Sequence, residues 1–198
     1  MNNANSVFGA NVNSLKGKTT RKSFNPVVTE YVEVPQLILY LNKKVTLAAD
    51  VMFFNGLALF VSTSWSIKFT TLEYTPKCTK IRLISSLNKV ISIYNASGFN
   101  IKTVLMVREF DCMIPYFLSI KINPTETSEH VPEIERQIRV IKERARSIRS
   151  KTPFTRTPKR VIIELLKFVV MWLNDLPVKS GVSYTFRPLT IMNGTTLD

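Results

Sequence analysis

The chain has few of the residues from which proteins build metal clusters, disulfides and nucleophilic sites. Its 198 residues include only two cysteines, Cys78 and Cys112, and one histidine, His130. A structural zinc site needs about four ligands of these kinds, so zinc is not expected. Two isolated cysteines are typical of a reducing compartment. The sequence also contains neither a Gly-x-Ser-x-Gly elbow nor a Gly-x-x-x-x-Gly-Lys loop, which argues against a serine hydrolase and a P-loop nucleotide site.

Long hydrophobic runs are missing as well. The most apolar window, Val161 to Leu173, contains Glu164 and Lys167 and is shorter than the roughly 20 residues of a membrane-spanning helix. We therefore expect it to form a buried helix. The N-terminal stretch Met1–Lys18 is rich in asparagine and lacks the apolar region of a signal peptide. Together these features predict an intracellular protein.

What the chain does have is positive charge. It carries 27 Lys and Arg residues against 14 Asp and Glu residues, a net charge of +13, and 45% of its residues are hydrophobic, enough for a real core. Such a balance favours a polyanionic partner, which could be DNA, RNA or an anionic membrane. The alternative is a basic surface that is merely solvated.

The middle of the chain has the pattern of a β-hairpin. Two apolar runs, Val45–Phe54 and Leu57–Thr63, are joined by Asn55-Gly56, a pair that favours a type I′ turn because both of its residues need positive φ. A third strand is predicted at Ile67–Tyr74.

Helical spacing dominates the rest. We predict a helix over Thr79–Tyr94, a short strand at Thr103–Met106 with a possible further strand at Phe117–Ile122, a helix over Glu129–Arg149 capped by Ser128, and a helix over Lys159–Asn174 that is apolar nearly all round. Three antiparallel strands, a helix, one or two further strands and two C-terminal helices make an α/β chain in the RNase H-like order, on a mixed sheet. We expect a disordered or linker segment at 1–30, a core at 31–176 and a loop-like C-terminal flank at 177–198.

Asp50 is the most informative single residue, because it lies inside an apolar strand, five positions before Asn55. A buried carboxylate costs several kcal/mol unless it is paired or binds a metal. Asp50 is therefore a candidate metal ligand. The alternative is an aspartate satisfied by hydrogen bonds near a strand end.

Glu135 is the second candidate. On a helical wheel, with about 100° per residue, it lies at the edge of the apolar seam, and Arg139, Lys142 and Arg146 follow on the same flank. A carboxylate followed by three cations suits a metal site that contacts a phosphodiester backbone. The alternative is an ordinary salt-bridged helix surface, with Glu135 paired to Arg139 at i+4.

Several segments resemble the integrase catalytic core of copia-type LTR retrotransposon polyproteins, a member of the RNase H-like superfamily. The hairpin segment Val45–Gly56, which reads VTLAADVMFFNG, is similar to that family's first catalytic strand. Glu129–Arg136, which reads EHVPEIER, is similar to the segment with its last catalytic glutamate. Further similarity is found at Ile141–Arg144, at Trp172–Asn174 and at Gly181–Ile191, and the resemblance covers roughly residues 16–194.

The resemblance implies a catalytic Asp, Asp, Glu triad that holds two Mg²⁺ (or Mn²⁺) ions for strand transfer at phosphorus. Asp50 matches the first aspartate and Glu135 the glutamate, with Glu133 as a weaker candidate. The second aspartate should follow Leu105-Met106, where this sequence has Val107. Glu109 and Asp111 are close in sequence, but a shift of two or four residues along a strand displaces a ligand by several ångström.

The resemblance therefore predicts a DNA-integration domain that is degenerate at its second catalytic position. It also implies a nuclear location, a possible homo-oligomer and an origin in a longer polyprotein. Three alternatives stay open: a decaying copy of a mobile element, a basic nucleic-acid-binding module without chemistry, and an RNase H-like nuclease of another lineage. The basic run Arg136–Arg160 fits the binding module equally well.

Overall fold

The computed structural model describes residues 29–125, 131–152 and 156–197, and residues Glu30–Thr196 form one compact unit. The elements are, in order, β1 (Thr29–Tyr31), α3 (Gln36–Leu41), β2 (Lys44–Phe54), β3 (Leu57–Ser64), β4 (Thr70–Tyr74), α4 (Lys80–Ala96), β5 (Asn100–Val107), the 3-10 helix η1 (Arg108–Tyr116), β6 (Lys121–Thr125), α5 (Pro132–Ser150), α6 (Lys159–Asn174), α7 (Pro188–Asn193) and β7 (Thr195–Leu197).

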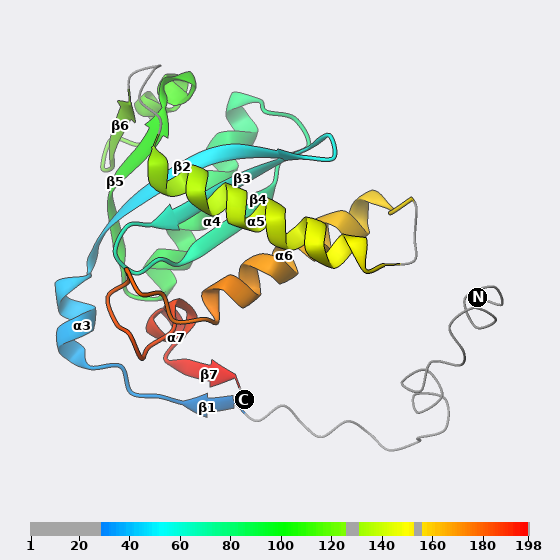
Figure 1. Cartoon of the computed structure of the whole chain (residues 1–198). Coiled ribbons are helices and arrows are strands. Elements are labelled where there is room, and N and C mark those ends of the chain that lie inside the picture. Colours follow the sequence, from blue (N-terminus) through cyan, green and yellow to red (C-terminus); the bar gives the residue numbers. More distant parts are fainter. Residues whose placement is uncertain (1–28, 126–130, 153–155, 198) are drawn as a thin grey trace, which may run out of the picture. The chain divides into compact units, whose positions relative to one another are not determined.

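Five strands form a mixed sheet in the order β4-β3-β2-β5-β6 (Figure 1). The strands β2, β3 and β4 are antiparallel to their neighbours in this group, whereas β5 runs parallel to β2 and β6 runs parallel to β5. The three antiparallel strands and the mixed sheet were predicted from the sequence, whereas the spatial order of the strands was not. A separate two-stranded sheet joins β1 and β7.

The predicted hairpin is confirmed in detail. Phe54 pairs with Leu57, and the two residues between them, Asn55 and Gly56, have φ values of 49° and 74°. Both values are positive, as a type I′ turn requires. This turn fixes the register of β2 against β3, and hence the sheet face on which each β2 side chain lies.

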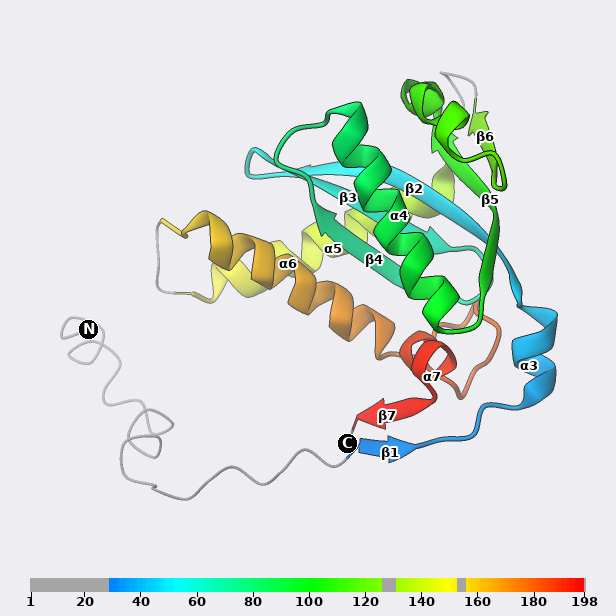
Figure 2. The same ribbon diagram turned by 180° about the vertical axis from the view of Figure 1, so that it is seen from behind.

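Helices cover both faces of the sheet. In Figure 2, α4 lies over one face of the sheet and α5 lies behind the other. Helix α6 packs its buried residues in the same core cluster as α5. Side chains of β2 alternate accordingly: Leu47 and Ala49 pack in the cluster that includes α4, whereas Ala48 and Met52 pack in the cluster that includes α5 and α6.

The α4 side of the core is anchored by Tyr94, which is fully buried. Its hydroxyl group donates a hydrogen bond to the carbonyl oxygen of Phe69 at 3.1 Å. Burial raises the pKa of this hydroxyl well above its usual range. The hydrogen bond ties α4 to the residue just before β4.

Helix α5 has the predicted buried seam, formed by Ile134, Ile138, Ile141 and Ala145. It begins at Pro132, in the first turn as expected, rather than at Glu129. The predicted cap Ser128 lies outside the described residues. Because these buried positions are three and four residues apart, the helix packs one stripe on the sheet and leaves two polar flanks.

Four details of the sequence interpretation are wrong. The further strand is β6 at Lys121–Thr125 rather than Phe117–Ile122, because η1 runs to Tyr116 and a turn follows it. The third strand begins at Thr70 rather than Ile67, because Ser64–Phe69 forms a turn in which Lys68 adopts a φ of 63°. The tail is not all loop-like, since α7 lies within it and packs Ile191 into the core.

The fourth error concerns α6, which is apolar on both sides but buried on only one of them. Ile163, Leu166 and Val170 are buried, but Phe168, Met171 and Trp172 are between 43% and 49% exposed. The hydrophobic periodicity of the sequence could not show which side of α6 is buried, because both sides of the helix carry apolar residues. Within the described part of the chain, no helix combines the length and apolarity needed to cross a bilayer.

Candidate functional site

A hollow of about 410 Å³ lies between β2 and α5. It is lined by Asp50, Val51, Met52, Phe53, Glu135, Ile138, Arg139, Lys142 and Arg146. The two carboxylates and the three cations that were singled out in the sequence therefore lie around one hollow. These residues come from two segments far apart in the chain.

Asp50 reaches the hollow because of strand alternation. It shares a sheet face with Ala48 and Met52, which pack towards α5. The side chain is half-buried rather than fully buried, and its Oδ1 accepts a hydrogen bond from the backbone N–H of Val51 at 2.7 Å. This hydrogen bond offsets part of the free-energy cost of burying the Asp50 carboxylate.

Glu135 and the three cations reach the hollow because they share one flank of α5. Glu135, Arg139 and Arg146 are exposed, and Lys142 is half-buried. At about 1.5 Å per residue, the distance along the helix from Glu135 to Arg146 is roughly 16 Å. The flank is thus acidic at its N-terminal end and basic along the rest, which creates a positive local field for an anion.

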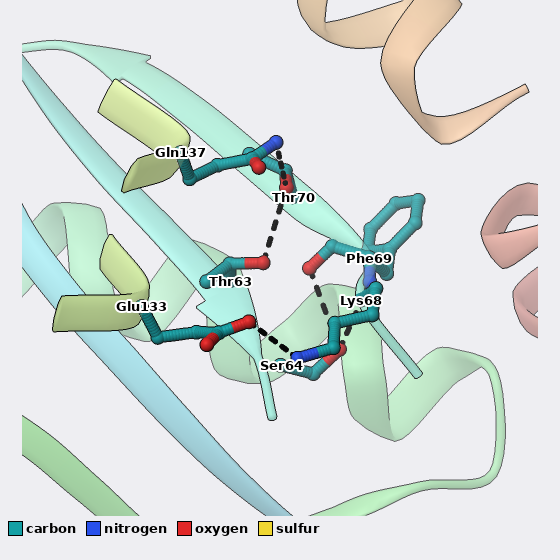
Figure 3. Close-up of polar contacts among 7 residues, drawn as sticks. All are labelled: Thr63, Ser64, Lys68, Phe69, Thr70, Glu133 and Gln137. Carbon is teal, nitrogen blue, oxygen red and sulfur yellow. Dashed lines mark hydrogen bonds and ion pairs between the residues drawn. The ribbon is translucent and has the colours of Figure 1, made fainter. Parts of the chain in front are cut away.

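The opposite flank of α5 is attached to the β3–β4 turn. Figure 3 shows Glu133 forming an ion pair with Lys68, and the side-chain amide of Gln137 donating a hydrogen bond to the Thr70 hydroxyl at 3.0 Å. Glu133 and Gln137 are four residues apart, so they lie on one side of the helix. These contacts fix the rotation of α5 about its axis, and with it the direction of the Glu135 flank.

Glu133, the weaker candidate for the last catalytic carboxylate, is thus engaged elsewhere. It does not line the hollow, and its partner Lys68 belongs to the turn before β4. The side chain of Lys68 is only 11% exposed. Its role as a helix anchor could not be found from sequence, because the two residues meet only in the folded chain.

Asn174, at the end of α6, binds the edge strand β4. Its Oδ1 accepts a hydrogen bond from the N–H of Thr70 at 2.8 Å, and its Nδ2 donates one to the carbonyl oxygen of Thr70 at 2.7 Å. The side-chain amide thus takes the place of a neighbouring strand at this position. The sequence had marked Trp172–Asn174 by resemblance, but without a role.

Position 107 lies at the level of Asp50. The parallel pairing of β2 with β5 joins Leu47 to Val104 and Ala48 to Leu105, and two further steps bring 107 level with 50. Strand β5 ends at Val107 and η1 begins at Arg108. Glu109 and Asp111 therefore lie on η1 and do not continue the strand.

This is also the place where the sheet topology favours a site. From β2 the chain continues to β3 on one side, and from β5 it continues to β6 on the other. In open α/β sheets, ligands bind beyond the carboxyl ends of strands where the chain diverges in this way. Val107 is the last residue of β5, whereas Asp50 lies within β2, four residues before its end.

The ligands at this place do not fit a pair of divalent ions. Asp50 and Glu135 supply carboxylate oxygens, but valine at position 107 has no ligand atom to offer. Among the residues that the structure describes, no group of three or more His, Cys, Asp or Glu side chains could hold a metal ion. Three cationic side chains line the same hollow and oppose a bound cation.

No protein-family model and no curated protein sequence matches the chain. Solved structures do. The HTLV-2 integrase catalytic core domain in complex with magnesium, in its dimeric form, has a TM-score of 0.53 at 18% identity over 75% of this chain and 94% of that one. Its trimeric form has a TM-score of 0.53 at 15% identity, covering 77% and 97%. The catalytic core domain of BIV integrase has a TM-score of 0.51 at 15% identity, covering 74% and 92%.

These likenesses establish the fold. The five-stranded mixed sheet with its helices is the RNase H-like fold of integrase catalytic cores, as the sequence predicted. At identities of 15–18%, these likenesses extend to the fold and not to the chemistry of this chain.

Proposed function

We propose that this chain is an integrase-like domain that binds DNA through the hollow between β2 and α5, and that its strand-transfer activity is impaired by valine at position 107. We further propose that it derives from the integrase of a copia-type LTR retrotransposon. The fold supports the integrase part of this proposal. The segments around Asp50 and Glu135 support the copia-type part, and integration would place the protein in the nucleus.

The observation that carries the proposal is the shared hollow. Arg139, Lys142 and Arg146 line it from one flank of α5, and Asp50 lines it from β2. Cations spaced along a helix suit the repeating charges of a phosphodiester backbone, and contacts of this kind position DNA without reading its sequence. The net charge of +13 adds a field of the same sign.

Strand transfer should be impaired because the second carboxylate is needed to hold two metal ions close together. Two divalent ions a few ångström apart repel each other strongly, and a carboxylate shared between them makes joint occupancy possible. Position 107 is level with Asp50 and offers no such carboxylate. The Mg²⁺ or Mn²⁺ that the family resemblance implies would therefore have only Asp50 and Glu135 as ligands here.

A non-catalytic nucleic-acid-binding module is the second candidate, and Val107 is the observation that favours it. Both candidates expect DNA binding. They differ in whether a carboxylate restored at position 107 brings back strand transfer, which an unrelated binding module would not gain.

We also propose that the domain forms a homo-oligomer. The apolar residues Val161, Phe168 and Trp172 are exposed along α6, and Leu176 follows just beyond it. They recur at intervals of seven, four and four residues, so they form a stripe on one side of the helix. An exposed apolar stripe of this kind suits an interface, and the related HTLV-2 domain is described in dimeric and trimeric forms.

Salt-dependent DNA binding tests the proposed function. Each phosphate that the protein no longer neutralises should reduce the slope of log K against log salt by about 0.9 for duplex DNA. We expect the triple variant R139A/K142A/R146A to bind duplex DNA more weakly and with a slope smaller by about 2–3. The assay is a fluorescence-anisotropy titration at several salt concentrations.

The matched control is K77A/R82A/K102A, which removes the same charge from exposed positions outside the hollow. Equal losses of affinity in the two triple variants would mean that only net charge matters. An affinity that is unchanged in R139A/K142A/R146A would contradict the proposed function.

A further inference from the structure

A second hollow, of about 340 Å³, lies between the C-terminal parts of α5 and α6. Helix α6 lines it with apolar side chains, among them Trp172 and Leu173. Helix α5 lines it with Arg144, Ser147, Ile148 and Lys151. These four residues have the spacing of neighbours on one face of a helix, so their side chains point to the same side. We refer to this hollow as the α5–α6 groove.

The α5–α6 groove is separate from the hollow that contains Asp50. Gln137, Arg144 and Lys151 follow one another at intervals of seven residues, which is almost two full helical turns, so they share one flank of α5. This is the flank on which Gln137 contacts Thr70, opposite the flank of Glu135. The two hollows have no lining residue in common.

The α5 wall of the groove carries positive charge that the chain does not neutralise. Arg144 and Lys151 are exposed, and no acidic residue lines the groove. Neither cation forms an ion pair with any residue that the structure describes. The opposite wall is apolar, and Trp172 is 49% exposed there. The groove therefore combines two cations on one side with uncovered apolar surface on the other.

We propose that the α5–α6 groove binds a short acidic, amphipathic segment of a partner protein. Apolar side chains of the segment would cover Trp172 and Leu173, and its carboxylates would pair with Arg144 and Lys151. Grooves between helices bind amphipathic segments in this way, with the apolar face inwards. The two cations are seven residues apart along α5, or roughly 10 Å, so the segment needs acidic groups at a similar separation. This inference goes beyond the proposed DNA-binding function and does not depend on it.

Charge and polarity favour this occupant over DNA and over a second copy of the chain. A phosphodiester backbone would find cations on only one wall, because the α6 wall is apolar. A second copy carries a net charge of +13, so its field repels Arg144 and Lys151. The α6 stripe that we propose for self-association includes Trp172, but it does not include the cations of α5.

Two fluorescein-labelled peptides of about five helical turns test the proposal. One has leucine along one face and glutamate on both flanks, and the other has glutamine in place of each glutamate. We expect the acidic peptide to bind in an anisotropy titration, and the glutamine peptide to bind about tenfold more weakly. The variant R144E/K151E should lose about tenfold in affinity for the acidic peptide. The control K77E/K102E makes the same charge change at exposed positions outside the groove and should lose much less.

Ser147→Trp fills the groove without a change of charge, and it should also weaken binding of the acidic peptide. Its control is Ser92→Trp, which adds the same ring at an exposed position on α4 and should leave the affinity unchanged. Equal effects in R144E/K151E and K77E/K102E, or in Ser147→Trp and Ser92→Trp, would overturn the proposal.

Duplex DNA is the third probe. R144E/K151E and K77E/K102E should lose affinity for it equally, because both change only the net charge. A larger loss in R144E/K151E would overturn the proposal, since the groove would then be a nucleic-acid surface. The effect expected of R139A/K142A/R146A on DNA binding stays the same in each case, so the proposed function is tested separately.

Discussion

Lys68 and Glu133 hold the start of α5 against the β3–β4 turn, through an ion pair whose side chains are 11% and 26% exposed. Removing one partner leaves a partly buried charge without its counterpart. We expect Lys68→Met or Glu133→Gln to lower the free energy of unfolding by about 1–3 kcal/mol. The double variant should be destabilised by less than the sum of the two single effects. Urea denaturation measures all three values.

Glu164 provides the control for this pair. It binds Lys167 at 3.1 Å, but both side chains are at least half exposed. Exposed pairs contribute about 0–1 kcal/mol, so Glu164→Gln should have little effect. Destabilisation of equal size in Glu133→Gln and Glu164→Gln would show that the Lys68 pair does not anchor the helix.

At the level of single residues, the sequence predicted those site residues that stand out in a local strand or helix pattern. Asp50 stands out against an apolar strand, and Glu135 and Arg139 share a helix flank by spacing alone. The role of Lys68 could not be predicted. Lys68 lies in a turn where it adopts a positive φ, and its partner Glu133 is distant in the sequence.

Among the elements, the edge strand β4 depends on a side chain from α6. Asn174 satisfies both backbone groups of Thr70, and its replacement by alanine would leave these buried groups unpaired. We expect Asn174→Ala to lower the free energy of unfolding by about 1–3 kcal/mol. The N–H of Thr70 should exchange its hydrogen faster, as measured by hydrogen exchange with NMR detection.

Asn95 serves as the comparison, because it is an exposed asparagine on α4, a helix that does not supply the Thr70 contact. Asn95→Ala should leave both the stability and the exchange at Thr70 unchanged. If Asn174→Ala left the exchange at Thr70 unchanged as well, the amide would not be acting as a substitute for a strand.

The elements also show where sequence patterns stop being informative. The β2–β3 hairpin is set by two adjacent residues, Asn55 and Gly56, so its prediction needed no knowledge of the rest of the fold. The exposed side of α6 is different. Both of its sides are apolar, and only the position of the sheet decides that Leu166 is buried and Phe168 exposed.

For the molecule as a whole, the exposed stripe on α6 predicts self-association. A charge in an apolar interface is costly to bury, so we expect Trp172→Glu to shift the protein towards the monomer in sedimentation velocity. Tyr184→Glu, at an exposed position away from α6, should not. An identical sedimentation profile for the Trp172→Glu variant and the unmodified protein would mean that α6 is not the interface.

At the same scale, the order of elements was predictable because it follows from turn signals and periodicity along the chain. The convergence of β2 and α5 around one hollow was predictable only through the family resemblance, since no local pattern states which helix crosses which strand. The register that brings Val107 level with Asp50 needed the folded sheet.

A strand-transfer assay, in which a labelled DNA end is joined to target DNA in the presence of Mg²⁺ or Mn²⁺, tests the role of position 107 most directly. The assay compares the unmodified protein with its Val107→Asp variant. We expect the unmodified protein to bind the DNA without detectable joining. The variant should gain joining activity, because a carboxylate at position 107 would lie level with Asp50. Robust joining by the unmodified protein would contradict the assignment of position 107 as the missing catalytic aspartate.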